Sequence, residues 1–276
     1  VQVSLSGCAN TDTVAVTVSD PQVDAGTDES VCSGGDVQLN ATGTGTFSWT
    51  PGTGLSASNV ADPIAAPTIT TDYIVTLTNG ANCSDSDTVQ VVVNELPVVS
   101  AGPDQTPCLN TTIDLGGSPT GPVGSTVAWT PATGLNSATD ANPTLTVTGD
   151  ATYIVVVTDA NSCVTSDTMQ VTVLPLPDVD AGPDLSVCAG SSIQLQGSDA
   201  GSLLWTPDFG LSDPTLPDPI CQPEITTIYT LTVTGSNTCT NSDQTTVTVN
   251  VLPSAEAGPD RTICAGDDVV IGTDGA

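Results

Sequence analysis

The side chains of this chain that could do chemistry are cysteines and carboxylates. The 276 residues include nine Cys and 31 Asp or Glu, against a single basic residue and no Lys or His. Without an imidazole or a Lys amine, the common general bases, Schiff-base formers and phosphate-binding groups are missing from the sequence. We therefore expect no enzyme, and we expect the chemistry to be disulfide formation, with calcium binding by the carboxylates as a further hypothesis.

Charge and hydropathy exclude several classes of partner. The formal net charge is −30, so nucleic acid and anionic membrane surfaces are expected to repel the chain. No apolar run in the sequence is long enough to cross a bilayer as a helix, and no membrane span is expected in this segment. No basic leader opens the sequence, so we expect any signal peptide to lie outside it.

The chain is a tandem repeat. The segment Ala-Gly-x-Asp begins at Ala25, Ala101, Ala181 and Ala257, so its copies are almost evenly spaced and the second is slightly longer. Seven residues after each Ala comes a Cys, followed by apolar residues in the alternation of a half-buried strand. In each complete copy a Trp, a Tyr and a second Cys then follow one another at identical intervals. These residues are Trp49, Trp129 and Trp205; Tyr73, Tyr153 and Tyr229; and Cys83, Cys163 and Cys239.

Short strands separated by turn residues, with no helical pattern, predict an all-β fold of tandem Ig-like antiparallel β-sandwich domains. Short Leu-Pro joints between the copies predict an elongated rod. The predicted segments are residues 1–20 (last strand of a preceding domain), 21–96, 97–176 and 177–252 (three Ig-like domains) and 253–276 (first strands of a following domain).

The recurrent Trp and Tyr have two interpretations. Each Trp could be an exposed platform for a ligand or a core residue that packs between the sheets. A platform would be expected to vary between copies or to be joined by other exposed aromatics, and only 3% of the chain is aromatic. We therefore expect all six Trp and Tyr to be core residues.

Nine cysteines at repeating positions, without zinc-type spacing, predict disulfides and an oxidising compartment outside the cytoplasm. Pairing across the joints gives nearly the same short separation throughout, but it requires loops of two sandwiches to bring their Cα atoms within about 7 Å. We favour pairing within each domain, which leaves Cys8 and Cys264 with partners outside the segment. The favoured pairs are Cys32–Cys83, Cys108–Cys163 and Cys188–Cys239.

Two further features stay open at this point. Cys221 stands where the first copy has Ala65, so we expect a small buried side chain; the alternative is a reactive or intermolecular thiol. Acidic residues gather near the domain ends, where oxygen ligands could bind calcium, although Asp also occurs in turns because it caps backbone amides. The candidate calcium ligands are Asp28, Asp87, Asp104, Asp167 and Asp184, and no other cofactor is expected.

The strings "AGPDQTPC", "WTPATGLNSATDANPTLT", "TYIVVVTDANSC" and "SDTMQVTV" resemble the Ig-like and PKD-like repeats of giant cell-surface proteins of Bacteroidetes, including gliding-motility adhesins. The resemblance covers essentially the whole chain. It implies export by the type IX secretion system, a β-sandwich fold and a role in a stalk or adhesive fibre. It also implies O-glycosylation at Thr13, Thr88 and Thr168, which match the Asp-Ser/Thr-hydrophobe signal of those bacteria.

Two functional hypotheses follow. The first is a non-enzymatic, disulfide-stapled stalk segment of an extracellular surface fibre or adhesin, with further repeats of the same chain and sister chains as partners. The second is a set of Ig-like modules that bind glycans or proteins through their loops. Loops that repeat uniformly between copies favour the stalk.

Overall fold

The structure is a computed structural model, and it describes residues 1–198, 201–255, 257–258, 260 and 262–269. Within these residues every named element is a β-strand, and none is a helix that could cross a membrane. The all-β prediction is therefore confirmed. The predicted boundaries of the individual domains stay a prediction, and the end of the last predicted segment, after residue 269, lies outside the described residues.

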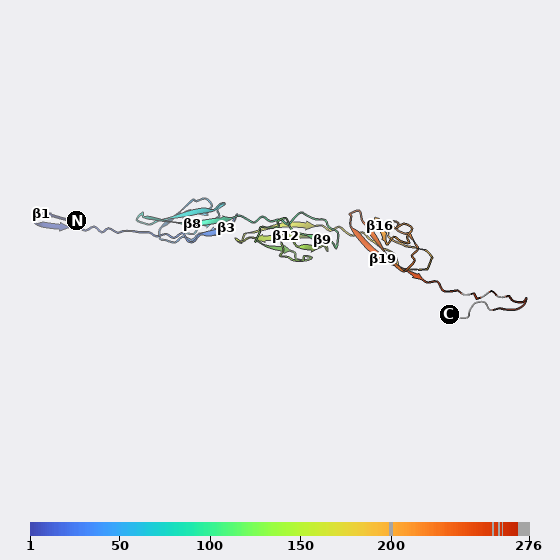
Figure 1. Cartoon of the computed structure of the whole chain (residues 1–276). Coiled ribbons are helices and arrows are strands. Elements are labelled where there is room, and N and C mark those ends of the chain that lie inside the picture. The colour runs from blue at the N-terminus through green and yellow to red at the C-terminus, as the bar shows by residue number, and fades with distance from the viewer. Residues whose placement is uncertain (199–200, 256, 259, 261, 270–276) are drawn as a thin grey trace. The chain divides into compact units, whose positions relative to one another are not determined.

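Three sets of strands follow one another along the chain, after a hairpin of β1 (Gln2–Leu5) and β2 (Cys8–Thr11) (Figure 1). We call these sets the first, second and third sandwich. The first contains β3 (Glu29–Cys32), β4 (Val37–Gln38), β5 (Thr46–Thr50), β6 (Ile64–Ala65), β7 (Thr71–Thr78) and β8 (Ser84–Asn94). The second contains β9 (Thr112–Asp114), β10 (Thr126–Thr130), β11 (Thr144–Thr146), β12 (Ala151–Thr158) and β13 (Val164–Val171). The third contains β14 (Leu185–Cys188), β15 (Ile193–Gln194), β16 (Ser202–Thr206), β17 (Ile220–Cys221), β18 (Thr227–Thr234) and β19 (Thr240–Asn250).

Each sandwich has one larger and one two-stranded sheet. The order of the larger sheet is β3-β8-β7-β5 in the first sandwich and β14-β19-β18-β16 in the third, and the small sheets are β4-β6 and β15-β17. In these larger sheets β3 pairs in parallel with β8, and β14 pairs in parallel with β19. The other neighbouring strands of both sheets are antiparallel. The second sandwich has β10-β12-β13 and β9-β11, and it has a parallel bridge between Cys108 and Leu174 in place of a first strand. The Gln105 N–H also donates to the Gln170 carbonyl of β13 (2.9 Å). This strand order contains the C-F-G sheet of an immunoglobulin-like sandwich.

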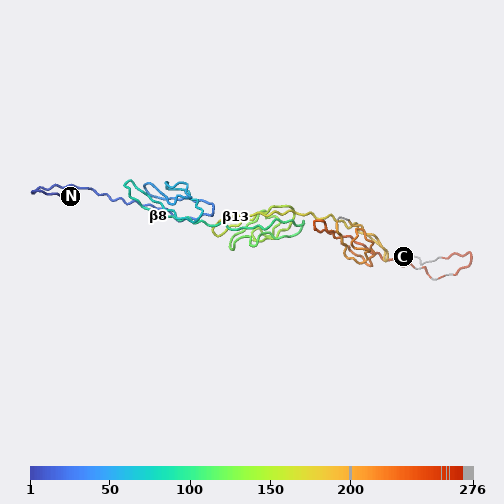
Figure 2. Tube along the Cα trace, turned by 90° about the horizontal axis from the view of Figure 1, so that it is seen from above, coloured from blue at the N-terminus to red at the C-terminus, as the bar shows by residue number. Residues whose placement is uncertain are grey.

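By its internal contacts the chain divides into two compact units. One unit holds residues 1–105, 112–146 and 151–170, and the other holds residues 106–111, 147–150 and 171–276. Figure 2 lets the reader follow the trace through β8 and β13, the last strands of the first and second sandwiches. The division passes through the second sandwich, so residues of that sandwich belong to both units.

Alternating side chains build the core of the first sandwich. Along β7, Tyr73, Val75 and Leu77 are buried while the residues between them are more exposed, as expected for a strand with one face against a core. Trp49 of β5 and Val89 of β8 join this core. The third sandwich repeats the arrangement around Trp205 and Tyr229.

All six Trp and Tyr expected in the core are buried, at 0 to 4% exposure. In the first sandwich the Trp49 indole N–H donates to the Val60 carbonyl (2.8 Å), and the Tyr73 hydroxyl donates to the Thr53 carbonyl (3.0 Å). Equivalent bonds run from Trp129 to Asp140, from Trp205 to Leu216, from Tyr153 to Thr133 and from Tyr229 to Phe209. Burial raises the pKa of the three Tyr hydroxyls. These rings hold the loop between two strands and present no face to a ligand.

Candidate functional site

Each sandwich holds its two repeated cysteines at opposite ends. One cysteine ends the first strand (β3 or β14) or, at Cys108, forms the parallel bridge that takes the place of this strand, and we call these the strand cysteines: Cys32, Cys108 and Cys188. The other directly precedes the last strand, and we call these the hairpin cysteines: Cys83, Cys163 and Cys239. Cys32 lies beside Asn94, at the far end of β8 from Cys83. Ten residue steps at about 3.3 Å each place the two ends of β8 about 33 Å apart.

Two disulfides connect successive sandwiches. Cys32 bonds to Cys163 and Cys108 bonds to Cys239, with Cα–Cα distances of 5.5 and 5.7 Å. Each bond spans 131 residues and joins a strand cysteine to the hairpin cysteine of the next sandwich. The same pairing, strand cysteine to the hairpin cysteine of the next sandwich, therefore occurs at both joints.

The predicted pairs Cys32–Cys83, Cys108–Cys163 and Cys188–Cys239 are wrong, because the structure pairs Cys32 and Cys108 with other partners and leaves Cys83 and Cys188 free. The physical reason is the length of the last strand. A disulfide requires Cα atoms within about 7 Å, and the last strand holds the two cysteines of one sandwich about five times farther apart. The alternative pairing across the joints, Cys83–Cys108 and Cys163–Cys188, is not formed either. It would join the hairpin cysteine of one sandwich to the strand cysteine of the next, whereas the observed bonds join the strand cysteine of one sandwich to the hairpin cysteine of the next.

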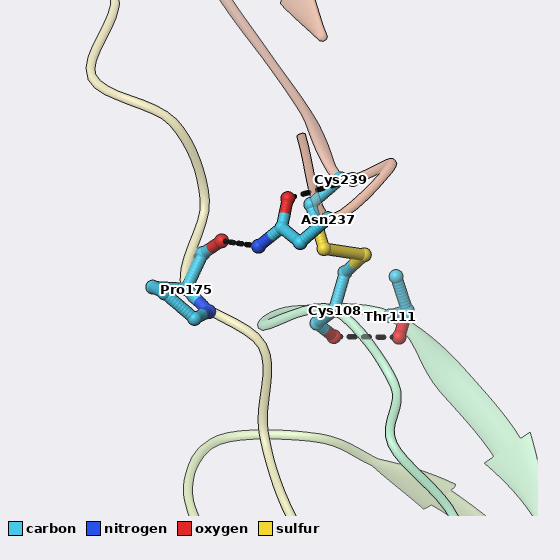
Figure 3. The surroundings of a disulfide bond; sticks show 5 residues. All are labelled: Cys108, Thr111, Pro175, Asn237 and Cys239. Atoms are coloured by element: carbon cyan, nitrogen blue, oxygen red, sulfur yellow. Dashed lines mark hydrogen bonds between the residues drawn. A yellow bond between two sulfur atoms is a disulfide. The ribbon is translucent and has the colours of Figure 1, made fainter. Parts of the chain in front are cut away.

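Side chains around the second joint hold the hairpin against the linker (Figure 3). The Asn237 side chain accepts the backbone N–H of Cys239 through Oδ1 (3.1 Å) and donates through Nδ2 to the Pro175 carbonyl (2.8 Å). On the other side of the disulfide the Thr111 hydroxyl donates to the Cys108 carbonyl (2.7 Å). The sulfur atoms therefore meet between two segments that are already ordered by hydrogen bonds.

Carboxylates tie the segment before each strand cysteine to the last strand of the same sandwich. In the first sandwich Asp87 accepts the Ala25 N–H (2.8 Å), and Asp28 accepts the Gln90 N–H (2.9 Å). The Ala N–H bond recurs as Ala101 to Asp167 and Ala181 to Asp243, and the reverse bond recurs as Gln170 to Asp104 and Thr246 to Asp184. Backbone N–H donors lower the pKa of the Asp87 and Asp243 carboxyls. The Ala-Gly-x-Asp segment and the Asp of the last strand therefore recur in each copy as partners in the same two hydrogen bonds.

The calcium hypothesis finds no assembled site. Among the residues that the structure describes, no group of three or more His, Cys, Asp or Glu is placed to hold a metal ion. Each proposed ligand instead accepts a backbone N–H; the five are Asp28, Asp87, Asp104, Asp167 and Asp184. Asp243 has the same role as Asp87, since it accepts the Ala181 N–H, but it was not among the candidate ligands.

The remaining candidate residues fall into two groups. Thr13, Thr88 and Thr168 are exposed, so their hydroxyls are open to modification. Cys221 is fully buried in β17 opposite Ile193, and burial raises the pKa of its thiol. Cys221 is therefore a core residue, and its protonated thiol is shielded from oxidants.

No protein-family model and no curated protein matches this chain. Solved structures match at low identity. Titin fragment I67-I69 is 15% identical, with a TM-score of 0.40 over 85% of this chain and 100% of that one. Sidekick-1 immunoglobulin domains 1-5 are 14% identical, with a TM-score of 0.31 over 84% of this chain and 59% of that one. The assignment to immunoglobulin-like sandwiches rests on the strand order of the chain itself.

Cleaving the linker tests the first joint. A recognition site for a sequence-specific protease is inserted between Val98 and Val99, next to the 82% exposed Val98. After cleavage we expect one full-length band on a denaturing gel without reductant and two bands with it, because Cys32–Cys163 spans the cut. The same insertion in a Cys163→Ser chain should give two bands in both lanes. If the cleaved chain that retains all its cysteines gave two bands without reductant, the assignment of the Cys32–Cys163 disulfide would be contradicted.

Acid should release the carboxylate bonds at Asp87 and Asp243. Their pKa values are lowered in the folded chain, so their stabilisation is complete above the unfolded pKa of about 3.9 and is lost as pH falls through the folded pKa. Asp87→Asn combined with Asp243→Asn should lower the free energy of unfolding at pH 7, by about 1 kcal/mol per site at most in these largely solvated positions.

The deficit of this double variant should shrink toward zero as the pH falls below the lowered pKa of the folded carboxyls, because the wild-type side chains are then protonated too. Asp36→Asn is the matched control, because Asp36 is exposed and accepts no hydrogen bond in the described part of the chain. Thermal unfolding followed by circular dichroism from pH 7 to pH 2 measures both variants. A deficit that is constant with pH would show that the charge of these carboxylates does not matter.

Proposed function

We propose that the chain is a non-enzymatic structural repeat segment of an extracellular surface fibre or adhesin, in which disulfide-stapled sandwiches form a stalk. The observation that carries the proposal is the pair of disulfides that run from one sandwich to the next. Disulfides persist in oxidising environments such as the cell exterior. Immunoglobulin-like tandems need no cofactor, and the partners of the segment are further repeats of the same chain and, in a fibre, sister chains.

The disulfides shorten the covalent path through the chain. The backbone path from Cys32 to Cys239 follows every residue between them. The path that crosses both disulfides uses only the segment between Cys108 and Cys163. At about 3.5 Å per extended residue, the maximum span falls from about 720 Å to about 190 Å. A stalk that transmits force would thus extend by a limited length even if its sandwiches unfolded.

Finer features of the proposal come from the resemblance to Bacteroidetes surface repeats. They are export by the type IX secretion system, a role in adhesion or gliding motility, and O-glycans on Thr13, Thr88 and Thr168. The exposure of these three residues supports the glycosylation sites. The predicted domains, 21–96, 97–176 and 177–252, would be the spacer units of the stalk.

Pulling the chain by its two ends tests the load-bearing role. In the oxidised protein we expect the span between Cys32 and Cys239 to extend to about 190 Å, and after reduction to about 720 Å. The Cys163→Ser variant should give about 270 Å, because its shortest path follows the backbone from Cys32 to Cys108 and then the second disulfide. Optical-tweezers contour lengths measure all three. Equal lengths before and after reduction would rule out load transfer through the disulfides.

One observation favours the alternative function, a binding module. The first sandwich has a cavity of about 580 Å³ lined by Thr53, Pro67, Ile69 and neighbouring residues, and the Ile69 side chain is 72% exposed. At the position of Thr53 the third sandwich has Phe209, whose ring lies 6.3 Å from that of Tyr229. The small side chain of Thr53 thus leaves space that a ring takes in the third sandwich. A cavity of this size lies within the range of small-molecule and sugar sites.

Thr53→Phe separates the two functions. If glycans bind in the cavity, this change should abolish binding on a glycan array, because the ring occupies the space as in the third sandwich. The Val123→Phe variant is the control, because Val123 is fully exposed on a loop of the second sandwich. Binding that survives Thr53→Phe, or the absence of binding in the unmutated chain, would leave the stalk as the function of this segment.

A further inference from the structure

We propose that the strand cysteine of every sandwich in the array bonds to the hairpin cysteine of the sandwich that follows it. Cys188 and Cys83 are then each one of the two cysteines of a further disulfide between sandwiches. The partner of Cys188 is the hairpin cysteine of a following sandwich. The partner of Cys83 is the strand cysteine of a preceding sandwich. Both partners belong to further copies of the same repeat, and the two observed disulfides show which cysteine of such a copy each partner is.

Cys188 has the backbone setting of the bonded strand cysteines. It ends β14 and pairs in parallel with Asn250, as Cys32 ends β3 and pairs with Asn94. The next residue, Ala189, donates its N–H to the Asn250 carbonyl (2.9 Å), matching the bond from Ser33 to Asn94 (2.8 Å). The Cys188 side chain is exposed and carries a free thiol. Cys188 therefore already has the backbone conformation of a bonded strand cysteine, and its thiol is accessible to a partner.

Cys83 has the setting of the bonded hairpin cysteines. The Asn79 N–H donates to the Cys83 carbonyl (3.0 Å), and the Asn79 Oδ1 accepts the Cys83 N–H (3.1 Å). Asp159 makes the same two bonds with the disulfide-bonded Cys163, at 3.0 and 2.8 Å. The residue before each hairpin cysteine has a positive φ, which aims the turn in the same way: Asn82 (58°), Ser162 (66°) and Thr238 (67°).

The hairpin of Cys83 is also tied to the chain that precedes its sandwich. The Asn79 Nδ2 donates to the Ser19 hydroxyl (2.7 Å), as the Asn237 Nδ2 donates to the Pro175 carbonyl beside the bonded Cys239. At the second joint this contact lies next to a disulfide, as Figure 3 shows. Cys83 therefore faces the region from which a preceding sandwich would supply its strand cysteine.

Each new bond is a two-electron oxidation. Two Cys thiols lose two protons and two electrons, and one S–S bond forms. The oxidant is a disulfide that is reduced to two thiols: glutathione disulfide in the test below, and a protein disulfide of a thiol oxidoreductase during export. Exposed thiols such as Cys188 exchange through a mixed disulfide, whereas the buried Cys221 does not.

Duplicating a sandwich supplies the missing partner. The full chain receives a second copy of residues 177–252 directly after residue 252, with Ser186→Thr and Thr240→Ser in the copy to mark its strand peptide and its hairpin peptide. The protein is refolded with reduced and oxidised glutathione, its thiols are alkylated, and it is cut at Asp and Glu without reduction. We expect mass spectrometry to find Cys188 joined to the marked hairpin peptide, alongside Cys32–Cys163 and Cys108–Cys239.

Only preparations in which Cys32–Cys163 and Cys108–Cys239 are essentially complete are scored, so that misfolded chains contribute little to the result. In these preparations an unmarked strand peptide with an alkylated Cys188, a glutathione adduct on it or a bond between Cys188 residues of two chains would overturn the proposal. Cys188→Ser should leave the copy's hairpin thiol alkylated, whereas Cys221→Ala, which copies the residue at Ala65, should change no linkage.

A second arm tests Cys83 independently. A copy of residues 21–96, marked by Ser30→Thr in its strand peptide and by Ser84→Thr in its hairpin peptide, is placed directly before residue 21. We expect the marked strand peptide to be joined to the unmarked hairpin peptide of the original Cys83. A free Cys83 in the unmarked hairpin peptide would overturn the proposal for this half. The test reads linkage only, so it can fail while the stalk function stands, and the stalk function can fail while the linkage is found.

Discussion

The last strand of each sandwich keeps the two repeated cysteines apart, and the covalent structure depends on this separation. β8 and β19 each contain 11 residues, and a strand of this length spans about 33 Å between its first and last residues. The parallel first strand places the strand cysteine beside the far end. A bond inside the sandwich is therefore excluded by distance, whereas the same geometry presents one cysteine at each end of the sandwich, where a neighbour can reach it.

The carboxylates make this arrangement reproducible from copy to copy. The segment before β3 has no strand partner at Ala25, so Asp87 accepts its N–H in place of a carbonyl, and Asp28 returns a bond to the last strand at Gln90. β3 begins at the next residue, Glu29, and ends at Cys32. Because the segment is anchored just before it becomes a strand, the position of the strand cysteine follows. Acidic residues that resemble a metal site in the sequence thus act as acceptors for the backbone.

Local patterns predicted the fold well, because alternation and Trp-Tyr spacing report directly on which residues face the core. The burial of Trp49 and Tyr73 follows from such patterns. Cysteine connectivity was not predictable in this way. Every copy contributes the same two cysteines, so spacing alone cannot distinguish partners, and the choice depends on the parallel pairing of Cys32 with Asn94. A parallel pair between the first and last strands of a sandwich leaves no local signal in the sequence.

The core of each sandwich and the disulfides between sandwiches have separate structural roles. The core of each sandwich is closed by one Trp and one Tyr whose polar atoms are satisfied by loop carbonyls, so no cysteine is needed to hold the sheets together. The two covalent loops, 32–163 and 108–239, share residues 108–163. Cutting the backbone at a joint leaves the disulfide, and reducing the disulfide leaves the backbone. Each joint is therefore connected twice, and separation of the array requires two independent chemical events at the same place.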